Sequence, residues 1–160
     1  MNQSRGVDKH SAQYPGREQG AHESFTDTWL IVPCYNEGQV IQDVLEHARE
    51  TFPNIVAVND GSHDNSAESI HAAGAHLVNH PVNLGQGAAI QTGVEYARTQ
   101  PGAKYFVTFD ADGQHQVKDV TRMIERLRTE PLDIIVGTRF AGQENSQVPV
   151  SYTHLTLPTK

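Results

Sequence analysis

The stretch KYFVTFDADGQH, Lys104 to His115, is an apolar run that ends in two carboxylates and an amide. A short apolar run closed by Asp and Gly is typical of a buried strand followed by a turn. Asp110 and Asp112 lie one residue apart, and carboxylates so close repel each other unless a cation lies between them. A turn over 111–113 would bring both carboxylates, with Gln114, to one ion. The stretch therefore predicts a strand with a metal site at its carboxyl end; the alternative is a solvated Asp-Ala-Asp-Gly turn.

The ligand types predict which metal such a site would bind. Carboxylate and amide oxygens, without a cysteine or a clear pair of histidines, favour Mg²⁺ or Mn²⁺ over Zn²⁺. An ion of this kind would complete its shell with water and phosphate oxygens and neutralise a diphosphate leaving group. His76 and His80 are four residues apart on a predicted strand, roughly 13 Å, so we do not expect them to share a metal.

The rest of the chain alternates apolar strands with amphipathic helices. Buried strands are predicted over 29–32, 54–58, 75–79, 104–109 and 132–136. Helices are predicted over 37–48, 66–73, 85–98 and 117–127, where apolar residues recur at helical spacing. This alternation predicts an α/β fold with right-handed crossovers and a mainly parallel sheet covered by helices on both faces.

Polar clusters follow four of the predicted strands: residues 33–37, 59–64, 110–114 and 137–139. In parallel sheets, ligands bind in the crevice beyond the carboxyl ends of the strands. Each cluster alone could be ordinary turn chemistry, because Asn, Asp, Gly and Ser dominate turns. Their common placement at one edge favours a nucleotide-type pocket.

The segment NDGSHDNS, residues 59–66, has two interpretations that can hold together. Asp60 follows a strand and can accept a hydrogen bond from a base or a ribose. The alternative is an Asx-turn leading into a capped helix, with Asp64 or Ser66 as the N-cap.

The segment NLGQGAAIQTG, residues 83–93, surrounds a predicted helix start with glycines. Gly-rich loops at helix N-termini often bind phosphate. The spacing matches neither the dinucleotide fingerprint nor the P-loop. We interpret the small residues as allowing close helix packing, with Asn83 and Gly87 near the ligand.

Arg139, in GTRF, can bind a phosphate through its planar guanidinium group, or it can form a surface ion pair. Cys34 has no histidine beside it in the sequence. We expect Cys34 to be a buried or pocket-wall thiol rather than a nucleophile.

Bulk composition excludes several classes of protein. The chain of 160 residues carries a net charge of −7 and no Lys/Arg-rich run, so we expect no nucleic-acid partner. The single cysteine excludes an internal disulfide and suits a reducing cytosol. No apolar run approaches the roughly 18 residues of a membrane span.

Both ends differ from the middle of the chain. Residues 1–27 are polar, and we expect a flexible tail. After residue 142 the periodic pattern stops, and the final VSYTHLTLPTK is similar to a translated sequencing adapter. We expect 28–142 to be the folded domain and 143–160 a disordered or artefactual tail; the alternative is a short natural extension.

Five segments in this order, VPCYNEG, NDGSHDNS, NLGQGAAIQTG, FDADGQH and GTRF, resemble family 2 glycosyltransferases of the GT-A fold. The form DADGQH is similar to the dolichyl- or polyprenyl-phosphate mannosyl- and glucosyltransferase branch. The resemblance covers about residues 28–142. It implies a Rossmann-like GT-A fold that is incomplete at the C-terminus, since nothing after 142 resembles the acceptor half.

The resemblance also implies roles for particular residues in binding a nucleotide-diphosphate-sugar. Pro33, Tyr35 and Glu37 match the nucleoside-contacting PxYNE motif, and Val58 and Asp60 match the base-binding strand end. The DXD motif matches Asp110, Ala111 and Asp112, with Gln114 as a further metal ligand; the two aspartates are the expected catalytic pair. Arg139 matches the phosphate-contacting arginine of a Gly-Ser-Arg motif. Two departures are Asn59, where the family has Asp, and Thr138, where it has Ser.

The expected function is therefore hexosyl transfer with inversion, dependent on Mg²⁺ or Mn²⁺, to an acceptor that is a lipid phosphate or a glycan. The expected location is the cytoplasm or the cytoplasmic face of a membrane, with a parent enzyme that is membrane-associated. The alternative is a non-catalytic nucleotide-sugar-binding fragment. Two other classes fit less well: a sugar-phosphate nucleotidyltransferase lacks its Gly-rich basic loop here, and a phospho-acceptor domain lacks its lysine.

Overall fold

The computed structural model describes residues 25–110 and 116–137. The chain divides into two units, Met1–Val120 and Thr121–Lys160. The first unit contains the sheet and the candidate site.

Four parallel strands form the sheet in the order β3-β2-β1-β4. Their bounds are β1 Thr28–Cys34, β2 Asn54–Asn59, β3 His76–Asn79 and β4 Tyr105–Thr108. The central register pairs Leu30 of β1 with Ile55 of β2 and with Val107 of β4. The predicted mainly parallel sheet is confirmed, with strand ends that differ from the predicted ones by one or two residues.

The central strands β1 and β2 are buried because their sequences are nearly continuous apolar runs, which suit a sheet covered on both faces. Pro33 lies within β1 rather than after it. The pairing of β1 with β4 ends at Ile31, two residues before Pro33, so the missing N–H of proline falls beyond that ladder.

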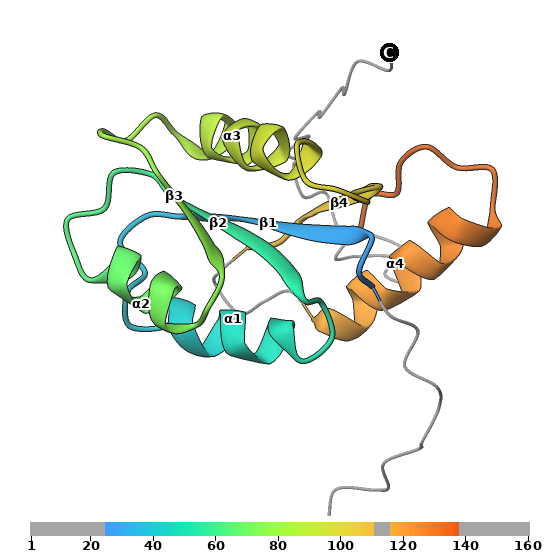
Figure 1. Ribbon diagram of the computed structural model, residues 1–160, viewed down its shortest axis with the longest axis horizontal. Helices are drawn as coiled ribbons and strands as arrows, with labels where there is room; N and C mark the ends of the chain where they lie inside the picture. Colours follow the sequence, from blue (N-terminus) through green and yellow to red (C-terminus); the bar gives the residue numbers. More distant parts are fainter. Residues whose placement is uncertain (1–24, 111–115, 138–160) are drawn as a thin grey trace, which may run out of the picture. The chain divides into compact units, whose positions relative to one another are not determined.

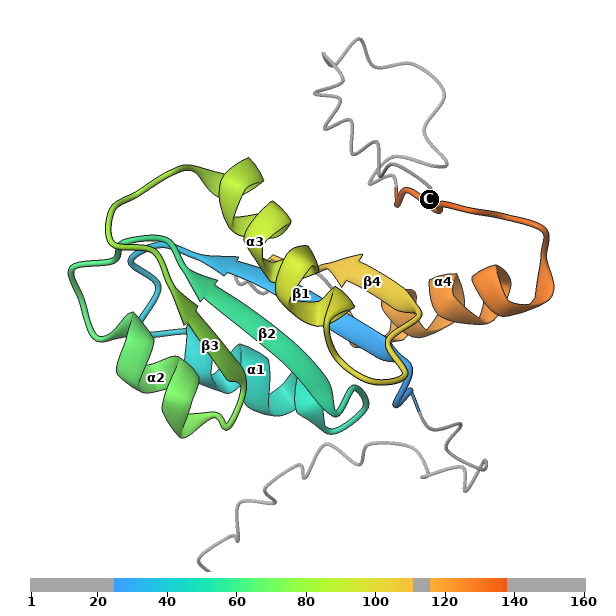
Figure 2. The same ribbon diagram turned by 45° about the horizontal axis from the view of Figure 1, so that its top comes forward.

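Helices cover both faces of the sheet, as Figures 1 and 2 show. Helix α3 (Gln86–Arg98) packs on β1 and β2 from one side, whereas α1 (Ile41–Arg49) and α2 (Ser66–Ala72) lie on the other. In α1, the buried residues Ile41, Leu45 and Ala48 recur at helical spacing. Helix α1 begins four residues later than predicted.

Helix α4 spans Val117–Thr129, close to its predicted bounds. Across residues 25–110 and 116–137, no helix is long and apolar enough to cross a membrane.

The predicted fifth strand over 132–136 is wrong, because the structure assigns no strand to these residues. Leu132, Ile134 and Val136 are 38%, 57% and 73% exposed. An apolar run becomes a strand only where a neighbouring strand accepts and donates its backbone hydrogen bonds. In the described residues, β4 is an edge strand of the sheet.

Candidate functional site

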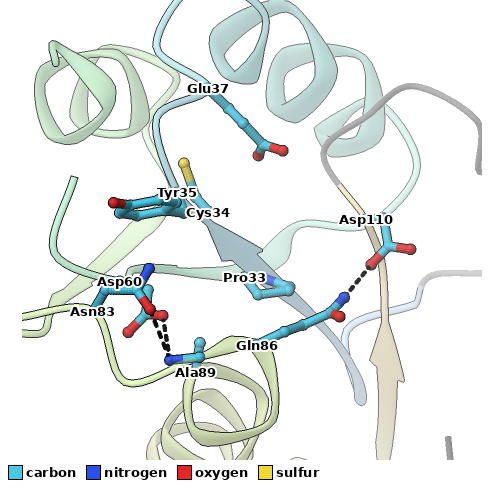
Figure 3. Close-up of a pocket in the computed structure, with 10 residues that line it drawn as sticks. Pro33, Cys34, Tyr35, Glu37, Asp60, Asn83, Gln86, Ala89 and Asp110 are labelled. Atoms are coloured by element: carbon cyan, nitrogen blue, oxygen red, sulfur yellow. Dashed lines mark hydrogen bonds between the residues drawn. The ribbon is translucent and has the colours of Figure 1, made fainter. Parts of the chain in front are cut away.

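A pocket of about 400 Å³ lies at the carboxyl edge of the sheet, and we call it the edge pocket. Its lining comes from the last residues of β1 and from the segments that follow all four strands (Figure 3). Six lining residues were predicted to bind the ligand: Pro33, Tyr35, Glu37, Asp60, Asn83 and Asp110. The other four are Cys34, Gly85, Gln86 and Ala89. The volume falls within the range typical of small-molecule sites.

The loop after β1 is held against the loop after β2 by hydrogen bonds. The backbone N–H groups of Asn36 and Glu37 donate to the hydroxyls of Ser62 and Ser66 at 2.9 and 3.1 Å. Asn36 has a φ of 55°, a left-handed conformation that Asn tolerates. These non-helical bonds explain why α1 starts late, and they fix the backbone that carries Tyr35 and Glu37.

Asp64 adds a further link between the same two loops. Its carboxylate accepts from the Gly38 N–H at 3.0 Å and from both the N–H and the hydroxyl of Ser66. The Ser66 hydroxyl, followed by the Gly38 N–H, lowers the pKa of Asp64. The N-cap of α2 is Asn65, which makes no side-chain capping bond. Asp64 therefore has the structural role that the sequence predicted, although it is not the formal N-cap.

Asp60 is a buried carboxylate, 3% exposed, at the end of β2. Its Oδ1 accepts from the Leu84 N–H at 2.9 Å and from Nδ1 of His80 at 2.7 Å. Its Oδ2 accepts from the Gly85 N–H at 2.8 Å. Burial alone would raise the pKa of Asp60, but these three bonds outweigh it and lower that pKa below its ordinary value of 3.8. A carboxylate accepts about four hydrogen bonds, so the observed three leave capacity for a ligand on Oδ2.

Asp110 reaches the opposite wall of the pocket from the end of β4. Nε2 of Gln86, the first residue of α3, donates to Oδ1 of Asp110 at 3.2 Å (Figure 3). This bond brings the helix start and the first aspartate of the DADGQ segment together across the pocket.

Cys34 lies in the pocket wall and is buried, as expected. Burial, with a smaller contribution from the Glu37 carboxylate, raises the pKa of its thiol from 9.0 to about 11. The thiol therefore stays protonated at neutral pH and is a poor nucleophile.

The glycines of the 83–93 segment have different roles. Gly85 has a φ of 92°, which favours glycine and lets its N–H point at Asp60. At Gly93, a Cβ would clash with Cγ2 of Ile31 and approach Cγ2 of Val58 at 3.3 Å. A Cβ at Gly87 would meet nothing within 4 Å. The close-packing interpretation therefore holds for Gly93, whereas Gly87 is not required for packing.

Two of the predicted binding residues do not line the edge pocket. Val58 is fully buried in the core, and Gly87 is exposed near the start of α3. Four others, Ala111, Asp112, Gln114 and Arg139, lie outside the described residues. Their predicted roles remain predictions.

Of the three predicted metal ligands, Asp110 lies within the described residues. Among the described residues, no three His, Cys, Asp or Glu side chains are grouped to hold an ion. Asp110 supplies one carboxylate at the pocket wall, and the other two predicted ligands lie in 111–115. An all-oxygen set of this composition suits Mg²⁺ or Mn²⁺.

Sequence reasoning missed the roles of Gln86 and His80. Gln86 lies inside a segment that was singled out, but its direction depends on where α3 begins. His80 was considered only as a metal ligand with His76. The useful signal was position: His80 directly follows β3 and Gln86 begins the next helix, at the edge where the other polar clusters gather.

In parallel α/β sheets, ligands bind in the crevice beyond the carboxyl ends of the strands, and the edge pocket lies there. Residues 29–157 match the family described as "Glycosyl transferase family 2". The chain belongs to this family.

Relatives and solved structures agree with this assignment. The chain is 31% identical over 142 residues to the UDP-N-acetylglucosamine–dolichyl-phosphate N-acetylglucosaminyltransferase of Methanococcus voltae, covering 77% of this chain and 56% of that protein. It is 33% identical over 139 residues to the dolichyl-phosphate β-glucosyltransferase ALG5D of Trichomonas vaginalis, covering 74% and 41%. The chain thus spans about half the length of these relatives.

The fold is that of glucosyl-3-phosphoglycerate synthase from Mycobacterium tuberculosis, whose structure was solved with Mn²⁺ and UDP-glucose. The TM-score is 0.54 at 20% identity, over 74% of this chain and 46% of that one. This likeness confirms the Rossmann-like GT-A fold.

Proposed function

We propose that this chain is the sugar-donor-binding part of an inverting glycosyltransferase that transfers a hexose from a nucleotide-diphosphate-sugar to a polyprenyl or dolichyl phosphate. The observation that carries the proposal is the edge pocket. Several separate motifs, which together predicted six binding residues, line this one cavity. Both relatives are named as dolichyl-phosphate glycosyltransferases, which supports the proposed acceptor.

Each side of the pocket suits one part of the donor. Tyr35 is 45% exposed, so its ring is available to stack against a base. Asp60 and Asn83 offer acceptor and amide groups on the same side, whereas Asp110 lies on the other (Figure 3). The nucleoside is therefore proposed to lie against Tyr35 and Asp60, with its diphosphate directed towards Asp110.

Asp110, Asp112 and Gln114 would hold Mg²⁺ or Mn²⁺, which supplies positive charge to a departing diphosphate. In the proposed reaction an oxygen of the acceptor phosphate attacks the anomeric carbon. The bond from that carbon to the diphosphate oxygen breaks, and the nucleoside diphosphate leaves with the electron pair. The acceptor is already anionic, so it needs little help from a general base. A lipid acceptor would put the parent protein at the cytoplasmic face of a membrane.

Calorimetric titration of the 160-residue chain tests the proposal. UDP-glucose, UDP-N-acetylglucosamine and GDP-mannose are titrated with and without Mn²⁺. We expect one of them to bind with Mn²⁺ and to lose at least about tenfold in affinity in Asp110→Asn and in Asp112→Ala, because each variant removes one anionic ligand.

Asp43→Asn is the matched control, since Asp43 is an exposed carboxylate of α1 that does not line the pocket. It should bind as the wild type does. A folded chain that binds none of the three sugar nucleotides would overturn the proposed function for this chain. If the affinity for the sugar nucleotide is the same without Mn²⁺ and in both aspartate variants, the site assignment is overturned.

A further inference from the structure

A partly buried chain of three hydrogen-bonded side chains lies behind the wall of the edge pocket. Nδ1 of His80 is 2.7 Å from Oδ1 of Asp60, and Nε2 of His80 is 2.9 Å from the hydroxyl oxygen of Thr92. The side chains of His80 and Asp60 are 8% and 4% exposed. The chain joins the end of β2, the residue after β3, and the middle of α3.

The ionised carboxylate of Asp60 fixes the direction of its hydrogen bond with His80. An ionised carboxylate only accepts, so Nδ1 of His80 must carry a hydrogen. In the uncharged ring Nε2 then accepts the hydroxyl proton of Thr92. Asp60 thus selects the ring form that donates to it, and the hydroxyl of Thr92 holds the other end of the ring through Nε2.

The orientation of the Asp60 carboxylate in turn affects the pocket wall. Its two oxygens accept the N–H groups of Leu84 and Gly85, in the loop that contributes Asn83, Gly85 and Gln86 to the lining. The backbone of the loop after β2 also packs closely against this segment, because a Cβ at Gly61 would lie 2.5 Å from the backbone nitrogen of Asn83. The loop over 83–86 therefore depends on the carboxylate orientation for its position.

We propose that His80 and Thr92 are positioning residues of the edge pocket: they orient the Asp60 carboxylate, which holds the 83–86 loop in the geometry that binds the nucleotide. The ligand-binding part of this inference rests on the proposed function. The loop-positioning part does not, and it is tested separately.

The chain offers a matched control on the same helix. Nδ1 of His76 is 2.8 Å from the hydroxyl of Tyr96, one turn along α3 from Thr92. Neither His76 nor Tyr96 lines the edge pocket. Thr92→Val and Tyr96→Phe each delete one hydroxyl bonded to a histidine, but only the first acts on Asp60.

The experiment measures amide hydrogen exchange at Leu84 and Gly85 by NMR in the 160-residue chain, together with the calorimetric affinity for the sugar nucleotide. We expect Thr92→Val to speed exchange at both amides and to weaken binding by about five- to tenfold, the effect of one lost buried hydrogen bond. Thr92→Ser keeps the hydroxyl, so its amide exchange and its affinity should match those of the wild type. Tyr96→Phe should change neither, and the ¹⁵N shifts of the His80 ring should move only in Thr92→Val.

Equal exchange at Leu84 and Gly85 in Thr92→Val and Tyr96→Phe would overturn the inference, whatever the affinity. Faster exchange with unchanged affinity would overturn its ligand-binding part. If the wild type binds no sugar nucleotide, the proposed function fails, and the exchange comparison still decides whether His80 and Thr92 position the loop.

Discussion

Asp60 and Cys34 are both buried acids in the wall of the edge pocket, yet their pKa values move in opposite directions. Burial favours the uncharged form of each. Asp60 has two backbone N–H donors and a histidine ring, which lower its pKa despite burial. For Cys34, burial outweighs a hydrogen bond from Ser66, and the nearby Glu37 carboxylate raises the pKa further. The number of local donors therefore decides whether hydrogen bonding or burial sets the direction of each pKa shift.

Cys34 should therefore react slowly with thiol reagents. With a pKa of about 11, its thiolate fraction at pH 8 is about two orders of magnitude below that of an unfolded cysteine. We expect labelling by Ellman's reagent at pH 8 to be slower in the native chain than in urea by at least about that factor. Because Cys34 is the single cysteine, the signal is unambiguous. Equal rates in the two states would contradict the burial of the thiol.

Among the elements, α3 brings together the pocket and the core. Its first residue, Gln86, bonds to Asp110, whereas its buried face, which includes Ala89, Val94 and Ala97, packs on β1 and β2. Gly93 lets the helix approach the sheet closely. The distance between helix and sheet thus sets where the helix start lies in the pocket.

Two glycine substitutions in α3 should have opposite effects on stability. In Gly93→Ala the added methyl group clashes with Ile31, so we expect the free energy of unfolding to fall by about 1–3 kcal/mol. In Gly87→Ala the methyl group enters open space, and the lower backbone entropy of alanine should raise that free energy by up to about 1 kcal/mol.

Urea unfolding followed by the fluorescence of Trp29, the only tryptophan, measures both variants. Trp29 is 4% exposed in the core, so unfolding will shift its emission. If Gly93→Ala has the same free energy of unfolding as the wild type, α3 does not pack closely enough on β1 for the added methyl group to clash.

At the scale of the whole molecule, Asp60 links stability to pH. Its folded pKa lies below the unfolded value of about 3.9, so the ionised carboxylate adds stability that is fully present above that value. The contribution is lost as the pH falls through the lower, folded pKa. Asp60→Asn lacks this titration and should be less stable at neutral pH, because an amide cannot accept all three donors.

We therefore expect the stability difference between the wild type and Asp60→Asn to be constant from pH 7 to about pH 5 and to shrink below about pH 4. Urea midpoints at each pH provide the measurement. A difference that stays constant down to pH 2 would mean that Asp60 is not held ionised by its three bonds.

The sequence predicted the four described strands, the four helices and six of the pocket residues, because apolar periodicity and polar strand ends are local signals. It was wrong about the strand over 132–136, where a short apolar run gave the same signal without a partner strand. It placed the start of α1 four residues too early, because the backbone N–H groups of Asn36 and Glu37 donate to the hydroxyls of Ser62 and Ser66 instead of continuing a helix.

By itself, then, the sequence determined the alternation of strands and helices, the family, and which loops carry polar groups. Only the tertiary structure decided how those groups are used. It gave Asp60 three internal donors, brought His80 and Thr92 behind it, and directed Gln86 towards Asp110. The physical reason is that these partners are 12 to 25 residues apart in the chain, and hydrogen bonds over such separations depend on how strands and helices pack.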